Sequence, residues 1–137
     1  MIQIPFDNRF LRLGEPFFTR TQPTPVARPV LIAFNRALAR ELGMVLEGAG
    51  DDELASIFSG NTPPPGAEPV AMAYAGHQFG HFVPQLGDGR AIWLGEIRAA
   101  NGTFDVQLKG SGRTVYSRGG DGRAALGPVL REYLVSE

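Results

Sequence analysis

Residues 90–109 read RAIWLGEIRAANGTFDVQLK, and they carry the clearest structural signal in this chain of 137 residues. Two strand-like runs, 90–97 and 103–109, flank Asn101-Gly102, a dipeptide that favours a tight antiparallel turn. The second run alternates apolar and polar residues, so one of its faces carries Asp105, Gln107 and Lys109. The pattern predicts an antiparallel β-hairpin with Lys109 at a strand end, on the polar face.

Helices are predicted on both sides of the strand-forming part of the chain. Apolar residues recur at helical spacing over Pro29–Gly43, Asp51–Phe58 opens with three acidic residues that suit a helix N-terminus, and Pro128 opens a third helix. Two short strand-like runs, 70–74 and 82–86, precede the hairpin. The sequence therefore predicts an α+β fold.

The proline-rich loop Gly60–Pro69 separates two kinds of sequence. An extended arm at 1–29 and the first two helices precede it, and the strands and the last helix follow it. We therefore divide the chain into an N-terminal arm with helices, 1–68, and a sheet-bearing part, 69–137. The last helix meets no Gly, Asn or Pro stop signal, so we expect the chain to be a fragment of a longer protein.

The composition excludes several classes of protein. Thirteen basic against 14 acidic residues give a net charge of −1, which argues against a general binder of nucleic acids or anionic membranes. The absence of cysteine excludes disulfides, thiolate metal sites and cysteine nucleophiles. No leader pattern and no run of 18 apolar residues occur, so we expect a cytoplasmic protein without a membrane partner.

Lys109 is the single lysine among the 13 basic residues. A lysine on a half-buried strand needs an anion, either a phosphate or a carboxylate of a neighbouring helix, whereas a solvated strand-edge lysine is the alternative. The last helix offers Glu132 and Glu137, which lie about 140° apart around its axis. Only one of them can face the lysine, and Glu132 lies nearer the apolar stripe. We predict that Glu132 is the partner of Lys109.

Two glycine-rich turns are candidate anion sites. Gly87 and Gly89 have no Cβ to keep a phosphate away, and Arg90 adds a forked pair of N–H donors. An ordinary hairpin turn is the alternative for this segment. Asp121-Gly122 can form a second tight turn between two arginines, for which a flexible surface loop is the alternative.

The two histidines are a weak metal signal. His77 and His81 have the i, i+4 spacing of helical metal ligands, but Gly76 and Gly80 weaken the helix that this spacing needs. No third ligand of the zinc type accompanies them. We therefore predict no metal-binding residue in this chain.

Longer motifs in the second half of the chain are specific enough to identify a family. They read YAGHQFGHFVPQLGDGR at 74–90, QLKGSGRT at 107–114, YSRGGDGRAAL at 116–126 and LREYL at 130–134. Together these motifs closely resemble the selenoprotein O family, also called the YdiU family. Val115 departs from the family pattern, which has proline there. Family members run to several hundred residues, so the resemblance implies that the chain is only their N-terminal region.

The resemblance implies a protein-kinase-like fold in which 69–137 form the N-lobe, an antiparallel sheet with an αC-type helix, preceded by N-terminal helices. Members transfer AMP from ATP to the Ser, Thr or Tyr hydroxyls of proteins with Mg²⁺ or Mn²⁺, and transfer of UMP from UTP is also ascribed to bacterial members. The catalytic base and the metal ligands belong to the C-lobe. We therefore expect this fragment to hold no catalytic residue and to be inactive alone.

The resemblance also assigns individual nucleotide-binding residues. It implies glycine-loop contacts at Gly87, Gly89 and Arg90, and a phosphate-binding lysine at Lys109. It places the base end of a flipped nucleotide at Asp121 and Gly122, and it makes Glu132 the ion-pair partner of the lysine.

Two other functions remain open on the sequence. One is an arginine- and glycine-rich nucleic-acid-binding module at Arg113–Arg123, although Tyr116 is the one ring there on which a base could stack. The other is an interaction domain in which the lysine is paired for structural reasons only.

Overall fold

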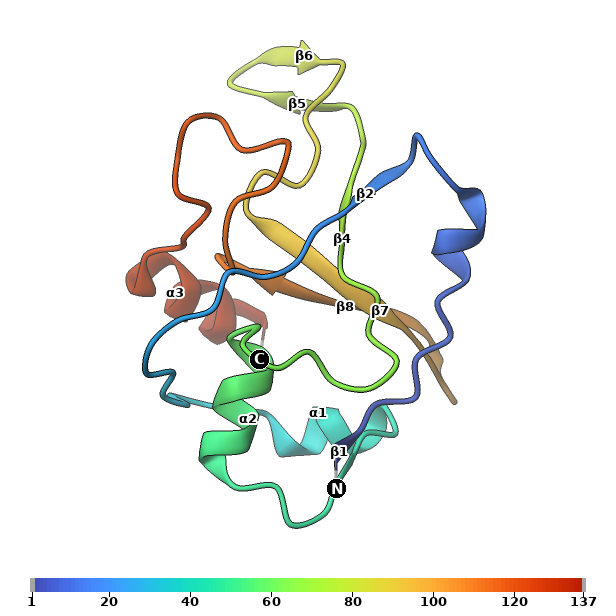
Figure 1. The fold of residues 1–137 in the computed structure, drawn as a ribbon, viewed down its shortest axis with the longest axis vertical. Coiled ribbons are helices and arrows are strands. Elements are labelled where there is room, and N and C mark those ends of the chain that lie inside the picture. The colour runs from blue at the N-terminus through green and yellow to red at the C-terminus, as the bar shows by residue number, and fades with distance from the viewer. Residues whose placement is uncertain (1, 137) are drawn as a thin grey trace.

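The structure, a computed structural model, describes residues 2–136 and is built around one long hairpin (Figure 1). Strand β7 (Ala91–Ala99) pairs antiparallel with β8 (Gly102–Lys109). Ala91 lies opposite Lys109 and Ala99 lies opposite Gly102, so the turn residues are Ala100 and Asn101 and Gly102 already belongs to β8. The predicted hairpin is confirmed, with its turn one residue earlier than the predicted Asn101-Gly102.

Two shorter strands extend the hairpin into a four-stranded antiparallel sheet of order β2-β4-β7-β8. Strand β4 (Val70–Met72) pairs with β7, and β2 (Phe18–Arg20) pairs with β4. Strand β2 belongs to the segment predicted as an extended arm, which also contains a 3₁₀ turn, η1 (Arg9–Leu13). The arm therefore provides an edge strand of the sheet.

Two small two-stranded sheets lie at opposite ends of the molecule (Figure 1). One joins β1 (Ile2–Gln3) to β3 (Val45–Leu46), and the other joins β5 (Gly76–Gln78) to β6 (His81–Val83). The strand predicted at 82–86 is therefore displaced and ends early. Strand β6 stops at Val83 because the next residue is a proline, which has no backbone N–H for a strand ladder.

The helices agree with the prediction in number, and differ in extent. Helix α2 (Asp51–Phe58) has the predicted bounds, with three acidic residues in its first turn. Helix α1 (Arg36–Glu41) covers less than half of the predicted Pro29–Gly43. It begins late because the Asn35 side chain accepts a hydrogen bond from the Leu38 N–H and so caps the helix at that point.

The last helix, α3 (Leu126–Ser136), begins two residues before the predicted start at Pro128. The proline lies in the first turn, where its missing N–H would have had no partner within the helix. The described residues of α3 include no buried side chain. The helix therefore lies on the surface, beside the end of β8 (Figure 1).

Strand β7 connects two clusters of buried side chains. Ile97 packs against Leu54 and Ile57 of α2, together with Ile2 and Ile4. Four residues earlier, Trp93 packs against Phe18 and Val70. Both central side chains, Trp93 and Ile97, are completely buried.

No helix among the described residues is long and apolar enough to cross a bilayer.

Truncation of a buried leucine tests the role of α2 in the core. Leu54 is fully buried, so Leu54→Ala should lower the free energy of unfolding by about 2–5 kcal/mol through lost contacts and a cavity. Leu134→Ala is the matched control, because Leu134 is 75% exposed, and it should change stability by less than about 0.5 kcal/mol. Urea unfolding of the 137-residue chain measures both, and equal effects would contradict this packing.

Candidate functional site

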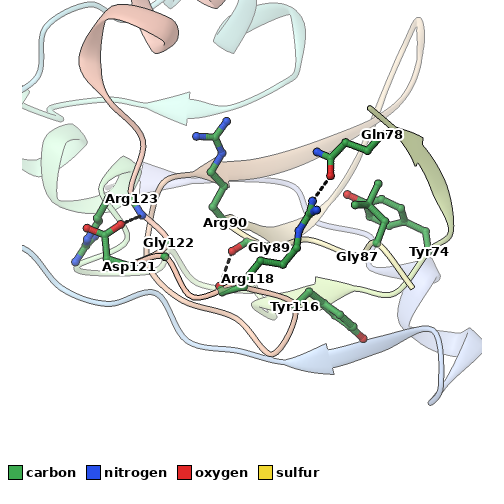
Figure 2. A pocket seen from close by; sticks show the side chains of 13 residues that line it. Tyr74, Gln78, Gly87, Gly89, Arg90, Tyr116, Arg118, Asp121, Gly122 and Arg123 are labelled. Atoms are coloured by element: carbon green, nitrogen blue, oxygen red, sulfur yellow. Dashed lines mark hydrogen bonds between the residues drawn. The ribbon is translucent and has the colours of Figure 1, made fainter. Parts of the chain in front are cut away.

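Two adjoining cavities lie at the open end of the β7–β8 hairpin. The larger has a volume of about 450 Å³, and its lining includes Gly87, Gly89, Arg90, Asp121 and Gly122 (Figure 2). The smaller has a volume of about 280 Å³ and is lined by Lys109, and it shares Gly89 and Arg90 with the larger one. The structure thus brings all six predicted nucleotide-contact residues to two connected hollows.

The register of the hairpin explains how distant residues meet here. Arg90 immediately precedes Ala91, the first residue of β7, and Ala91 lies opposite Lys109, the last residue of β8. The backbone N–H of Gly110 donates to the Arg90 carbonyl at 2.7 Å, which closes this end of the ladder. The glycine turn and the lysine are therefore neighbours through strand pairing.

The turn at 86–89 is held by backbone bonds, from the Leu86 and Gly87 N–H groups to the Tyr74 carbonyl at 2.9 and 3.1 Å, and by Asp88, whose carboxylate is buried under it. Its two oxygens accept hydrogen bonds from the Met72 N–H at 3.0 Å, the Tyr74 hydroxyl at 3.0 Å and the Gln107 side-chain amide at 3.3 Å. Burial raises the pKa of the Asp88 carboxyl, and the three donors oppose that shift. Burial and the nearby carboxylate raise the pKa of Tyr74 to about 12, so its hydroxyl stays a donor.

Two hydroxyl groups of the loop at 110–123 hold the same turn from the other side. The Thr114 hydroxyl donates to the Asp88 carbonyl and the Ser117 hydroxyl donates to the Gly89 carbonyl, each at 2.5 Å. The ring of Tyr116 lies against Gly87, where an added Cβ would collide with it. The two glycine-rich segments predicted separately therefore form one packed unit.

The second glycine turn is held by Arg123 and by a close backbone approach. The Arg123 N–H donates to the Asp121 carboxylate at 2.9 Å, and its guanidinium donates to the Thr24 carbonyl at 3.1 Å. Gly122 has φ +73°, and a Cβ there would overlap the backbone of Gly112. Only glycine fits this position without moving the loop.

Lys109 forms an ion pair with α3. Its Nζ atom lies 2.5 Å from Glu132 Oε1, and both side chains are partly open to water. The hydrogen bond from Lys109 lowers the pKa of the Glu132 carboxyl, with smaller contributions from Arg90 and Arg131. Glu132 is therefore ionised at neutral pH. The alternative partner considered from the sequence, Glu137, lies outside the described residues.

The larger cavity has a cationic lining. Three arginines, Arg90, Arg118 and Arg123, contribute to it, against one lining carboxylate, that of Asp121. Arg118 reaches across the opening and donates to Gln78 (Figure 2). Within residues 2–136, the Arg90 guanidinium makes no side-chain hydrogen bond or salt bridge, and its charge acts on Glu132 from a distance, so it can turn to a ligand. An open cavity with this charge, at which the Gly89 backbone is partly exposed, suits an anion with several phosphates.

Sequence reasoning missed the residues that support the turn, namely Tyr74, Asp88, Gln107, Thr114 and Ser117. Alternation did place Gln107 on the polar face of its strand, which was a usable signal. Nothing in the sequence revealed that Asp88 is only 3% exposed.

The histidines are not on a helix. His77 lies in β5 and His81 in β6, on the two strands of a hairpin. Among residues 2–136, no group of three or more His, Asp or Glu side chains could hold a metal ion. Val115, the departure from the family motif, is 66% exposed and buries nothing at the site.

The fold and the cavity together define a class of protein: one with an antiparallel sheet that has a glycine- and arginine-lined cavity at one end. Comparison with known proteins narrows this class. A family model described as Protein adenylyltransferase SelO matches residues 1–137. The chain belongs to the SelO family.

Curated relatives in this family are close in sequence. The Protein nucleotidyltransferase YdiU of Rhizobium meliloti (strain 1021) is 67% identical over 133 residues, which are 96% of this chain and 27% of the relative. The protein of the same name from Rhodopseudomonas palustris (strain BisB18) is 64% identical over 137 residues, 99% of this chain and 28% of the relative. The chain thus spans little more than a quarter of the length of these relatives.

Two glycines of one loop test the close backbone approach. Gly122 and Gly119 have φ +73° and +77°, but a Cβ on Gly119 would meet nothing within 4 Å. Gly119→Ala should cost about 1–2 kcal/mol for its left-handed backbone alone. Gly122→Ala should cost roughly 1–3 kcal/mol more because it also collides with Gly112. Urea unfolding compares the two, and equal losses would contradict the contact.

Proposed function

We propose that this chain supplies the ATP-binding part of an enzyme that transfers AMP from ATP to Ser, Thr or Tyr hydroxyls of proteins. The observation that carries the proposal is the lysine and glutamate pair beside the glycine turn. Lys109, at the end of β8, forms an ion pair with Glu132 of α3. Lys109 and Arg90 both line the smaller cavity. A triphosphate lying there would meet Arg90, Lys109 and the backbone of Gly87 and Gly89.

We also propose that 69–137 correspond to a kinase-like N-lobe. The order of elements supports this: a glycine turn, a strand that ends in lysine, and a helix whose glutamate pairs with that lysine. Protein kinases place a glycine loop over the nucleotide phosphates and hold their lysine by a helix glutamate in the same order. In this arrangement α3 takes the place of the αC helix.

The transfer itself follows from the chemistry of ATP. The oxygen of the protein hydroxyl attacks the α-phosphorus, the bond from that phosphorus to the bridging oxygen breaks, and pyrophosphate leaves. Positioning and charge neutralisation supply most of the catalysis in such reactions. Arg90 and Lys109 would neutralise phosphate charge, and Asp121 and Gly122 would contact the base end of the nucleotide.

The remaining catalytic groups are proposed to lie outside this chain. The described residues do not fit a Mg²⁺ or Mn²⁺ site, because no cluster of suitable ligands exists among them. The base that removes the hydroxyl proton is likewise assigned to the other three quarters of the protein. UTP has the same triphosphate, so transfer of UMP through the same contacts belongs to the proposal, and competition between labelled ATP and UTP measures the preference.

Removal of the lysine in the full-length protein tests the site. Lys109→Ala should lower kcat/KM for AMP transfer by roughly 100-fold or more, because one cation that neutralises the phosphates is lost. Lys109→Arg should also be impaired, because a planar guanidinium cannot replace a compact ammonium. Transfer from labelled ATP to a protein acceptor is the measurement.

The matched control breaks an exposed ion pair elsewhere. Arg20 lies in β2, the edge strand at the other side of the sheet from β8, and forms an ion pair with Glu68 at 3.0 Å. Arg20→Ala therefore removes one cation and one exposed ion pair that do not line the cavities. It should leave transfer unchanged, and both variants should keep the melting temperature of the wild type. Near-normal transfer by Lys109→Ala would refute the role of the lysine.

The 137-residue chain alone should transfer no AMP. The chain has one wall of the proposed cleft and lacks the proposed base and metal ligands. Incubation with labelled ATP and the acceptor, beside the full-length protein at equal concentration, measures this. Transfer by the short chain would place the catalytic groups within it and refute this division of the site.

A further inference from the structure

The Asp88 carboxylate is the most deeply buried charged group that the nucleotide contacts do not use. It is 3% exposed and lies between the two glycines of the turn. Its oxygens accept from three places: the backbone of β4 at Met72, the hydroxyl of Tyr74, and the side chain of Gln107 in β8. All three partners are donors, so the set matches an ionised carboxylate, and Asp88 lines the smaller cavity together with Arg90 and Lys109.

The backbone of Asp88 is tied down as well as its side chain. Its N–H donates to the Met72 carbonyl at 3.0 Å, and its carbonyl accepts from the Thr114 hydroxyl at 2.5 Å. Asp88 therefore links β4, β8 and the 110–123 loop through one residue. The turn between Leu86 and Arg90 has little freedom to change shape while these bonds hold.

We propose that Asp88 is the positioning residue of the glycine turn, which it holds in the shape that directs Gly87, Gly89 and Arg90 at the nucleotide. This inference rests on the proposed function. Asp88 lines the smaller cavity, but its negative carboxylate would repel a phosphate, so it does not serve as a phosphate contact. It acts through the backbone on either side of it, and the Thr114 hydroxyl closes the turn from the opposite side.

The buried charge of Asp88 does not itself stabilise the fold. Burial raises the pKa of Asp88 above its ordinary value of 3.8, so the folded protein holds that proton more tightly than the unfolded chain. Ionisation of Asp88 therefore lowers the free energy of unfolding as the pH rises above 3.8 through the raised pKa. At neutral pH the charge itself costs stability, and the benefit of the residue lies in the geometry that it holds.

The isosteric amide preserves that geometry without the charge. In Asp88→Asn the amide oxygen can accept from Met72 and Gln107, while the amide NH₂ faces Tyr74, whose hydroxyl can rotate to accept instead of donate. Asp88→Ala removes all three acceptor contacts and leaves the turn held by its backbone bonds to Met72 and Tyr74 and by the hydroxyls of Thr114 and Ser117.

The test uses the full-length enzyme and steady-state AMP transfer, with KM for ATP and kcat measured separately. Asp88→Ala should raise KM for ATP by roughly tenfold or more, since small misplacements of binding groups are costly, and Asp88→Asn should stay within about threefold of wild type. Asp105→Ala is the control, because Asp105 of β8 accepts a hydrogen bond from the Trp93 indole N–H and lines neither cavity. It should leave KM unchanged.

A purely structural role predicts a different result: less active protein, hence a lower apparent kcat, with KM unchanged. That result for Asp88→Ala overturns the proposal, and so does an Asp88→Asn variant as impaired in KM as Asp88→Ala. If Asp88→Ala does not fold, Thr114→Val decides, because at nearly constant shape it removes the hydroxyl that donates to the Asp88 carbonyl and accepts from the Tyr116 N–H. A wild-type KM for Thr114→Val overturns the proposal, and a raised KM supports it.

The wild-type protein distinguishes failure of the proposed function from failure of the positioning role. A wild-type protein that neither binds ATP nor transfers AMP refutes the nucleotidyltransferase assignment itself. A wild-type protein that transfers AMP, with variants of unchanged KM, refutes only the positioning role of Asp88.

Discussion

Strand β7 carries apolar side chains on both of its faces, and both faces are covered by other parts of the chain. Ile92, Trp93, Leu94 and Ile97 are all fully buried, at roughly 1.5–3 kcal/mol for each large apolar side chain removed from water. Phe18 and Val70 cover Trp93, while α2 and the first residues of the chain cover Ile97. Residues before the proline-rich loop therefore complete the core of the sheet that follows it.

The same hairpin that organises the core also determines where the candidate site forms. Because side chains alternate along a strand, a slip of one residue in the β7–β8 register would turn Lys109 to the opposite face, away from Glu132. The turn at the far end sets the register from Ala99 to Gly95, and a β-bulge between Trp93 and Gly95 shifts it by one residue before Lys109 is reached. The turn and the bulge together thus control which residues can meet a ligand.

The sequence predicted what depends on local patterns and missed what depends on distant partners. The hairpin and α2 follow from an Asn-Gly turn, alternation and an acidic first turn. The predicted helix at Pro29–Gly43 is wrong over its first half, because periodicity cannot show that Asn35 caps the helix or that Val30 stays 80% exposed. Likewise, the two glycine turns were predicted from composition, but the role of Asp88 depends on partners 14 to 26 residues away in the chain.

The ion pair between Lys109 and Glu132 is better understood as a device for orientation than as a source of stability. Both side chains are partly open to water, where screening leaves an ion pair with little net energy. A flexible lysine without Glu132 would sample many positions, whereas the pair keeps the ammonium at the cavity that Arg90 also lines. Since Glu132 belongs to a surface helix with no buried side chain among its described residues, movement of α3 would move the lysine's partner without disturbing the core. The site therefore joins a rigid turn, held by Asp88, to a cation whose position depends on a loosely attached helix.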